Sequence, residues 1–98
     1  MKEKQFFVYI MASSKNGSIY TGITSNLAGR VWEHKNKCDP KSHTSKYNIT
    51  RLVYYEQFED AEAAIDREKL IKSKTRAYRV KLIEADNPNW SELYHRLD

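Results

Sequence analysis

The sequence predicts an α/β (α+β) fold, in which a three-stranded antiparallel sheet is flanked by helices. Residues 5–11 read QFFVYIM, a run too evenly apolar for a strand with one face in water, and they predict a central strand covered on both sides. Asn16-Gly17 separates this run from residues 18–23, SIYTGI, which is a strong hairpin signal. Residues 49–58, ITRLVYYEQF, are rich in β-branched and aromatic side chains and form the third predicted strand.

The turn of this hairpin decides which side chains share a face of the sheet. A type I′ turn centred on Asn16-Gly17 pairs Lys15 with Ser18. Because successive side chains of a strand alternate between the two faces, Tyr9 and Tyr20 then emerge on the same face. A slip of one residue would separate the two tyrosines, so this prediction depends on the turn.

The segment after the hairpin reads as a helix from about Leu27 to near Asn36, with Ser25 or Asn26 available as its N-cap. Residues at i, i+3, i+4 and i+7 share one face of a helix, and here they are Leu27, Arg30, Val31 and His34. This face should pack on the sheet, so the arginine and the histidine should point at protein or into a cleft. Together with the two tyrosines they form a predicted site.

A second helix should begin after Asp60, which is suited to cap it. Its apolar stripe includes an acidic residue, since the members are Ala61, Ala64, Ile65, Glu68 and Ile71. A carboxylate on a buried face costs several kcal/mol unless it is paired or binds a metal. Glu68 therefore either pairs with Arg30 or another base of the first helix, or it holds a hard cation such as Mg²⁺, and the pattern alone favours neither.

The last third of the sequence predicts two more helices. Residues 72–76, KSKTR, lead into a helix that Ser73 or Thr75 would cap and that runs to about Glu84. Asn87-Pro88 then suits the start of a short additional helix at about residues 88–97. Its apolar stripe contains Trp90, Leu93, Tyr94 and Leu97. This helix would close the core or cover an edge of the sheet, and the alternative is a face that docks a protein partner.

Length and composition limit the class of protein. The 98 residues, 40% of them hydrophobic, suit a single domain over residues 1–98 with a modest core. No apolar run approaches a membrane span, and no signal peptide is evident. A single cysteine, Cys38, excludes an internal disulfide and fits a reducing compartment, so we expect a cytoplasmic protein. His34, Cys38 and His43 lack a fourth ligand and a recognised finger spacing, which argues against a zinc site.

The distribution of charge indicates a polyanionic partner. The net charge is +4, and the stretch from Arg67 to Lys81 has seven basic residues against one acidic residue. Basic residues concentrated on particular elements are typical of a nucleic-acid-binding surface, although a solvated helix face is the alternative for any one such run. Residues 37–48, KCDPKSHTSKYN, read as a polar, basic loop. The candidate phosphate contacts are Lys35, Lys37, Lys41, Lys46, Lys72, Lys74 and Arg76.

The same residues resemble the signatures of the GIY-YIG nuclease family. The two tyrosine signatures correspond to Phe7-Val8-Tyr9 and Tyr20-Thr21-Gly22. Arg30 and His34 match the arginine of the family's first helix and the histidine or tyrosine four residues later. Glu68 stands at the ligand position of a segment, DREKLIK, that resembles the family's metal-binding segment. The resemblance covers nearly the whole chain and is closest to small stand-alone bacterial members.

This resemblance implies a GIY-YIG endonuclease-like fold, one divalent ion (Mg²⁺ or Mn²⁺) on Glu68, and Arg30 on the scissile phosphate. It also implies a tyrosine in proton transfer. A free tyrosine titrates near 10 and needs nearby positive charge to act as a base. We assign proton transfer to Tyr20, orientation of the water or phosphate to Tyr9, and activation of Tyr20 to His34.

Two positions depart from the pattern of several nuclease relatives, which have a lysine where this chain has Ile23 and an asparagine where it has Arg79. The function predicted from the sequence is metal-dependent hydrolysis of nucleic acid. The predicted substrate is DNA in a structured or single-stranded form. The alternative is a non-catalytic or weakly active nucleic-acid-binding module of the same fold.

Overall fold

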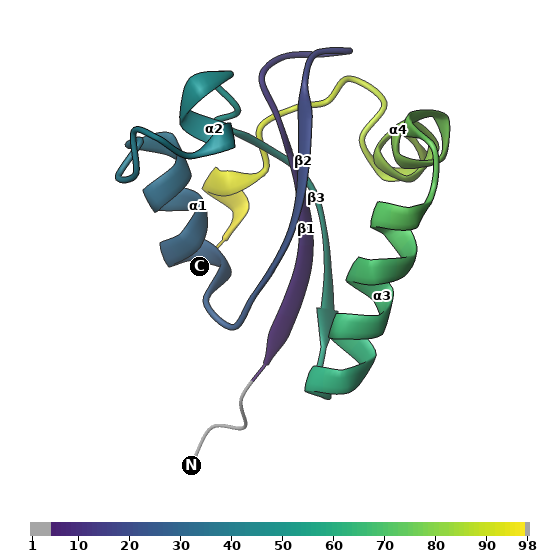
Figure 1. Ribbon diagram of the computed structural model, residues 1–98. Helices are drawn as coiled ribbons and strands as arrows, with labels where there is room; N and C mark the ends of the chain where they lie inside the picture. The colour runs from purple at the N-terminus through teal and green to yellow at the C-terminus, as the bar shows by residue number, and fades with distance from the viewer. Residues whose placement is uncertain (1–4, 98) are drawn as a thin grey trace.

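The computed structural model describes residues 5–97 and confirms the predicted sheet flanked by helices. Its strands are β1 (Phe6–Ala12), β2 (Ile19–Thr24) and β3 (Arg51–Phe58), and all neighbouring pairs are antiparallel. The order in the sheet is β2-β1-β3, so the apolar run at the start of the chain is the central strand, as predicted. In Figure 1 the sheet is seen edge-on, with β2 nearest the viewer and no helix in front of it.

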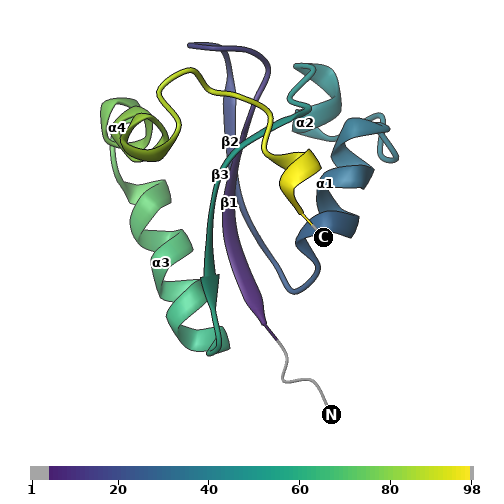
Figure 2. The same ribbon diagram turned by 180° about the vertical axis from the view of Figure 1, so that it is seen from behind.

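Helices cover both faces of the sheet (Figures 1 and 2). On one face lie α1 (Leu27–Lys35), α2 (His43–Lys46) and a C-terminal 3₁₀ turn, η1 (Tyr94–Arg96). On the other face lie α3 (Ala61–Ser73) and α4 (Arg76–Asp86).

Each face of the sheet has its own apolar core. The core under α1 is formed by Tyr9, Met11, Leu27, Val31, Ile49 and Leu52. The core under α3 and α4 is formed by Val8, Ile10, Ala12, Val53, Ala64, Ile71, Ile83 and Trp90. Alternate residues of β1 therefore enter opposite cores, which explains why this strand is apolar throughout.

The hairpin turn differs from the predicted type I′ turn. Asn16 has a φ of 62°, but Gly17 does not have a positive φ, and the turn closes with Gly17 N–H donating to the carbonyl of Ser14 over 3.0 Å. Tyr20 consequently pairs with Met11, two residues away from the predicted register. A shift of two residues preserves the alternation of side chains, so Tyr20 still lies on the face of Tyr9.

The caps of the longer helices follow the sequence signals. Side chains accept a backbone N–H at the starts of α1, α3 and α4, where the caps are Asn26, Asp60 and Thr75. The segment predicted as a loop at residues 37–48 contains the one-turn helix α2, because the Ser42 hydroxyl accepts the backbone N–H of Ser45.

The predicted C-terminal helix at residues 88–97 is wrong, since only the 3₁₀ turn η1 forms there. Asn87 is the C-cap of α4 and not the N-cap of a further helix, and its side-chain amide donates to the carbonyls of Val53 and Ser91, which ties the segment to β3. Trp90 has a φ of 54°, is fully buried, and donates from Nε1 to Glu84. The indole therefore closes the core, and the alternative of a docking face built on Trp90 is also wrong.

Among residues 5–97, no helix is both long and apolar enough to cross a membrane.

Candidate active site

Three aromatic rings from three elements meet on the α1 face of the sheet. The ring centroids of Tyr9 and Tyr20 are 6.3 Å apart, those of Tyr9 and His34 are 5.9 Å apart, and those of Tyr20 and His34 are 5.5 Å apart. Tyr9 is 1% exposed and His34 is 5% exposed, whereas Tyr20 is only partly buried on the edge strand. The structure thus brings together the tyrosines and the histidine of the predicted site.

A glycine makes room for this packing. Gly22 lies directly opposite Tyr9 in the hairpin, and an added Cβ would lie 2.6 Å from Tyr9 Oη and 2.7 Å from Tyr9 Cζ. The Tyr9 ring therefore lies across the backbone of Gly22, where any side chain would collide with it. This close approach explains why the second tyrosine signature, Tyr20-Thr21-Gly22, ends in a glycine.

Gly22→Ala should destabilise the protein by about 1–3 kcal/mol, because the added methyl group overpacks a buried, hydrogen-bonded ring. Alanine also reduces the backbone freedom of the unfolded chain, which would stabilise the folded protein by about 0.5–1 kcal/mol. The clash is the larger effect, so the net change should be a lower free energy of unfolding. Thermal and denaturant unfolding measure the effect. A variant as stable as the wild type would show that Tyr9 does not need this gap.

The hydroxyl of Tyr9 lies in the interior and contacts the histidine. Tyr9 Oη and His34 Nε2 are 3.0 Å apart, within hydrogen-bond distance. Burial raises the pKa of Tyr9 well above its usual value, the neighbouring Tyr20 adds to this, and the charge of Arg30 offsets it only in part. Tyr9 therefore remains a neutral hydroxyl at physiological pH. The predicted action of His34 on Tyr20 has no direct hydrogen bond behind it, since the tyrosine that is hydrogen-bonded to the imidazole is Tyr9.

His34 is held between two elements. Its Nδ1 lies 2.9 Å from Oγ1 of Thr44, a buried residue of α2. Burial lowers the pKa of His34, the positive charge of Arg30 lowers it further, and Glu33 opposes these effects. The imidazole is therefore neutral near pH 7 and is free to accept a hydrogen bond.

The lowered pKa of His34 predicts a loss of stability in mild acid. In the unfolded chain the imidazole takes up a proton near pH 6.5, and in the folded protein it does so only at lower pH. The unfolded state thus binds more protons between these two values, so the free energy of unfolding should decrease as pH falls through about 6.5. Melting temperatures from pH 8 to pH 5.5 measure this, and His34→Gln should flatten the curve. His95→Gln, on an exposed position of η1, is the matched control and should leave the curve unchanged.

Arg30 lies at the rim of this cluster. Its guanidinium donates to Glu33 over 2.9 Å, and the side chain is 45% exposed. Beside it is a cavity of about 230 Å³ whose wall includes His34, Asp39 and Thr44. Arg30 is thus solvent-accessible on the same face as the buried tyrosine and histidine, which suits contact with an anion.

Glu68 belongs to α3, in the layer on the opposite face of the sheet from the ring cluster. Its carboxylate is 15% exposed and lies 2.9 Å from the ammonium of Lys72, one turn along α3. The predicted alternative of an ion pair is correct in kind but wrong in partner, because Glu68 pairs with Lys72 of α3 and not with Arg30 or another base of α1, and Arg30 pairs with Glu33. No group of three or more His, Cys, Asp or Glu residues that could hold a metal forms among residues 5–97, so Glu68 offers a single carboxylate.

The orientation of α3 places Glu68 on the side of β2. Arg67 binds Glu56 of β3 with three nitrogen–oxygen contacts of 2.9–3.1 Å, which fixes one flank of the helix toward β3. Ala61 and Ile65 line a small apolar pocket with Ile23 and Thr24 of β2. Glu68 follows these residues by seven and three positions, so it belongs to the flank that faces the β2 edge.

The same argument places Arg30 on the β2 side of α1. Lys35, on the other flank of the helix, donates to the carbonyl of Thr50 beside β3 and pairs with Glu92. Arg30 precedes Lys35 by five residues and lies on the opposite flank, toward β2. The sheet edge at β2 is therefore bordered by Arg30 on one face and by Glu68 on the other.

The predicted phosphate contacts do not form one surface. Lys35 forms an ion pair with Glu92, and the Lys37 ammonium donates a hydrogen bond to the side-chain carbonyl of Asn48. Arg76 donates to the carbonyl of Gly17 in the hairpin turn over 2.6 Å. Lys41 and Lys46 are exposed beside the cavity-lining loop, whereas Lys72 is paired with Glu68.

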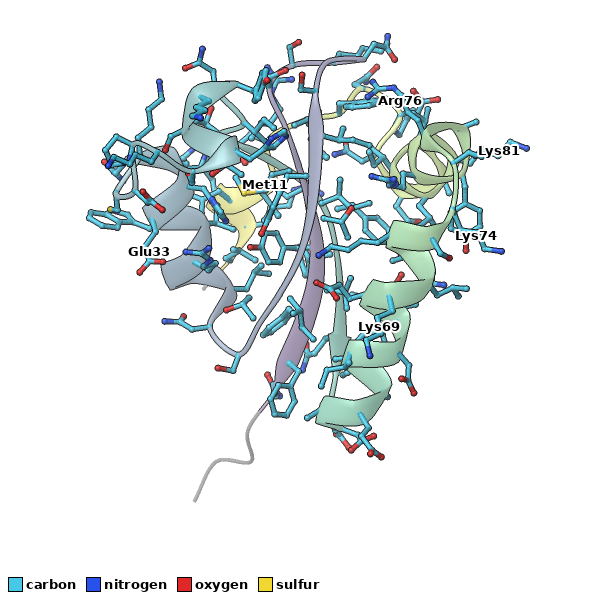
Figure 3. The ribbon with its side chains drawn as sticks, in the orientation of Figure 1. Met11, Glu33, Lys69, Lys74, Arg76 and Lys81 are labelled. Atoms are coloured by element: carbon cyan, nitrogen blue, oxygen red, sulfur yellow. The ribbon has the colours of Figure 1, made fainter. Side chains whose placement is uncertain are left out.

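Figure 3 adds a lysine that the sequence analysis did not select. Lys69 of α3 lies on the side of the helix toward the viewer, where β2 is the nearest strand, while Lys74 and Lys81 point away from the sheet. Lys69 is exposed and is in the same turn of α3 as Glu68. Lys69 follows Arg67 by two residues and so lies on roughly the opposite side of α3. This spacing could have selected Lys69 from the sequence only if the flank of the helix that faces β3 had been known.

The two departures from the family pattern have different surroundings. Ile23 alternates with Tyr20 and Gly22 and packs against the core under α3. Arg79 of α4 donates from Nη2 to the carbonyl of Lys74 over 3.3 Å. Neither residue contributes to the ring cluster on the α1 face.

Comparison with known proteins identifies the family of this chain. Residues 5–82 match the family described as the GIY-YIG catalytic domain, and they include both tyrosine signatures, the arginine, the histidine and the glutamate. The chain belongs to the GIY-YIG family. This membership supports nuclease function in general terms.

Small bacterial proteins of the UPF0213 group are similar over most of their length. One from Clostridium perfringens is 40% identical over 79 residues, which is 81% of this chain and 83% of that protein. One from Desulfotalea psychrophila is 34% identical over 89 residues, which is 91% of this chain and 80% of that protein. The solution NMR structure of a UPF0213 protein from Bacillus halodurans superposes with a TM-score of 0.56 at 26% identity, covering 90% of this chain and 92% of that one.

Proposed function

We propose that this GIY-YIG protein is a metal-dependent nuclease that hydrolyses phosphodiester bonds of DNA. The observation that carries this proposal is the meeting of Tyr9, Tyr20 and His34 next to the solvent-accessible Arg30. Of these residues, Tyr20 lies on the edge strand β2. Because Arg30 and Glu68 border the β2 edge from opposite faces, a nucleic-acid strand laid along β2 would reach both of them. The exposed edge thus serves as the floor of the proposed site (Figure 1).

Hydrolysis of a phosphodiester needs an activated water, positive charge on the phosphate, and help for the leaving oxygen. Arg30 is suited to bind the phosphate, because a guanidinium matches two phosphate oxygens in a bidentate geometry. Tyr20 is the partly buried tyrosine of the cluster, and its hydroxyl is hydrogen-bonded to none of the side chains in residues 5–97. It is thus free to accept a hydrogen bond from the attacking water, while the buried Tyr9 stays protonated and holds the cluster in place.

The residues present fit Mg²⁺ or Mn²⁺ better than zinc. Magnesium is usually bound by one or two carboxylates and completes its coordination with waters and substrate phosphate, so the single carboxylate of Glu68 is a sufficient protein ligand. When bound there, the ion would neutralise charge on the phosphate. Lys72 would then have to leave the carboxylate, and its half-exposed side chain is free to do so.

Cleavage assays with plasmid, branched and single-stranded DNA, and with RNA of the same sequence, test this proposal. The protein should cleave at least one DNA substrate with Mg²⁺ or Mn²⁺, and the activity should disappear with a chelator. Arg30→Ala is expected to lose cleavage, whereas Arg96→Ala, an exposed arginine on η1, is the matched control and should keep it. Absence of metal-dependent cleavage of every substrate would contradict the proposal.

Lys69 should contribute a phosphate contact beside the β2 edge. For duplex DNA each neutralised phosphate adds roughly 0.9 to the slope of log affinity against log salt, so Lys69→Ala should reduce the slope by about that amount. Lys81→Ala makes the same change on a side chain that points away from the sheet, and it should leave the slope unchanged. Equal effects of the two variants would place the bound DNA elsewhere.

The second candidate function is a weakly active or non-catalytic nucleic-acid-binding module. It is favoured by the Glu68–Lys72 ion pair, which occupies the only proposed metal ligand, and by Ile23, which packs into a core where relatives have a lysine. Binding without chelator-sensitive cleavage would select this candidate.

A further inference from the structure

A chain of hydrogen bonds extends from the tyrosine–histidine cluster into the loop between α1 and β3. It begins with Tyr9 and His34 and continues from His34 Nδ1 to Thr44 Oγ1 over 2.9 Å. Thr44 Oγ1 is 3.1 Å from Ser42 Oγ, which is 3.1 Å from Ser45 Oγ. The Ser45 hydroxyl ends the chain by donating to the backbone carbonyl of Asp39 over 2.7 Å.

The carbonyl at the end of this chain determines the direction of every bond in it. A carbonyl only accepts, so the single proton of Ser45 is committed to Asp39. Ser42 donates its proton to Ser45, and the bond between Ser42 and Thr44 must therefore use the proton of Thr44. Thr44 Oγ1 has no further proton to give, so it accepts from the ring of His34.

This direction selects one of the two neutral forms of the imidazole. With its proton on Nδ1, the neutral ring of His34 has an unprotonated Nε2, which accepts the hydroxyl proton of Tyr9. The burial that lowers the pKa of His34 keeps the ring neutral, which this arrangement requires.

We propose that Thr44 is a positioning residue that fixes His34 as its Nδ1–H tautomer, so that the Tyr9 hydroxyl donates inward and only accepts from the substrate side. Its effect on cleavage rests on the proposed nuclease function, whereas the tautomer itself does not. Tyr9 would then accept a hydrogen bond from Arg30, but would not donate to a phosphate oxygen. The opposite tautomer would donate from Nε2 and release the Tyr9 proton toward the site.

Two variants of Thr44 separate its hydroxyl from its volume. Thr44→Val keeps the shape of the side chain and removes the hydroxyl, whereas Thr44→Ser keeps the hydroxyl. Nitrogen-15 NMR of the histidine rings near pH 7.5 reports which ring nitrogen carries the proton, and the His34 signals are identified by their loss in His34→Gln.

The wild type and Thr44→Ser should show His34 protonated on Nδ1 alone, and Thr44→Val should lose this single form. The kcat for cleavage should fall roughly 10- to 100-fold in Thr44→Val with little change in KM. Thr44→Ser should keep a kcat near that of the wild type. A wild-type His34 protonated on Nε2 would overturn the proposal, and this result does not depend on the stability of any variant of Thr44. A His34 tautomer that is unchanged in Thr44→Val would also overturn it. If no cleavage occurs at all, the NMR result still decides the role of Thr44, so failure of the nuclease proposal remains distinguishable.

Discussion

Tyr20→Phe should lower the rate of metal-dependent DNA cleavage by about 100- to 10,000-fold and leave folding and DNA binding unchanged. The substitution removes one hydroxyl from a partly exposed ring that is hydrogen-bonded to none of the other side chains in residues 5–97. Folding therefore loses little, while the proposed reaction loses the group that accepts from the attacking water. Single-turnover cleavage, DNA binding and thermal unfolding of the same preparation measure the three quantities.

Tyr55→Phe is the matched control for this variant. Tyr55 pairs with Tyr9 from the opposite side of β1, packs on the same core, and is partly buried like Tyr20. The same loss of a hydroxyl there should leave the cleavage rate near that of the wild type. Equal losses in the two variants would mean that Tyr20 acts through packing, and full activity of Tyr20→Phe would remove it from the chemistry.

The face shared by Tyr9 and Tyr20 could be predicted from the sequence although the hairpin register could not. Strand periodicity fixes which residues alternate, and an error of two residues leaves that alternation intact. The turn itself depends on which residue takes a positive φ, and asparagine and glycine are both suited to it. Asn16 alone takes it, so the turn is displaced by two residues relative to the strands.

The partners of His34 lay beyond what periodicity can show. Helical spacing predicted that this residue faces the sheet, and it is buried there. It could not indicate that the loop after α1 folds back over the helix and brings Thr44 to Nδ1, because a polar loop has no repeating pattern. The same limit explains Trp90, where an apolar spacing typical of a helix is used by an irregular segment tied to β3 through Asn87.

The position of Glu68 could be predicted only in part. The apolar stripe of α3 places it beside buried residues, and it is mostly buried. Which flank of the helix faces β2 depends on the contact between Arg67 and Glu56, two residues whose pairing the sequence does not specify. With that contact known, Glu68 is the acidic residue of α3 best placed at the β2 edge.

Glu68→Gln should abolish metal-dependent cleavage, with a loss of at least about 100-fold, and should preserve or slightly strengthen DNA binding. The amide keeps the size of the side chain but is a poor ligand for a hard cation, so the proposed ion loses its only protein carboxylate. Removal of one negative charge also frees Lys72 to contact phosphate. Titration of Mn²⁺ followed by calorimetry, together with cleavage at increasing metal concentration, measures both consequences.

Glu62→Gln makes the same change on an exposed residue in the first turn of α3 and should retain both Mn²⁺ binding and cleavage. Because Glu68 is mostly buried and paired with Lys72, its variant could also lose activity through a shift of the helix. Lys72→Ala breaks the same ion pair and keeps the carboxylate, so it should retain cleavage if the role of Glu68 is to bind metal. Chelator-sensitive cleavage that survives in Glu68→Gln would place the ion elsewhere. If Glu68→Gln and Lys72→Ala both lose cleavage while Mn²⁺ binding is unchanged, the function of Glu68 is its ion pair with Lys72 and not the binding of metal.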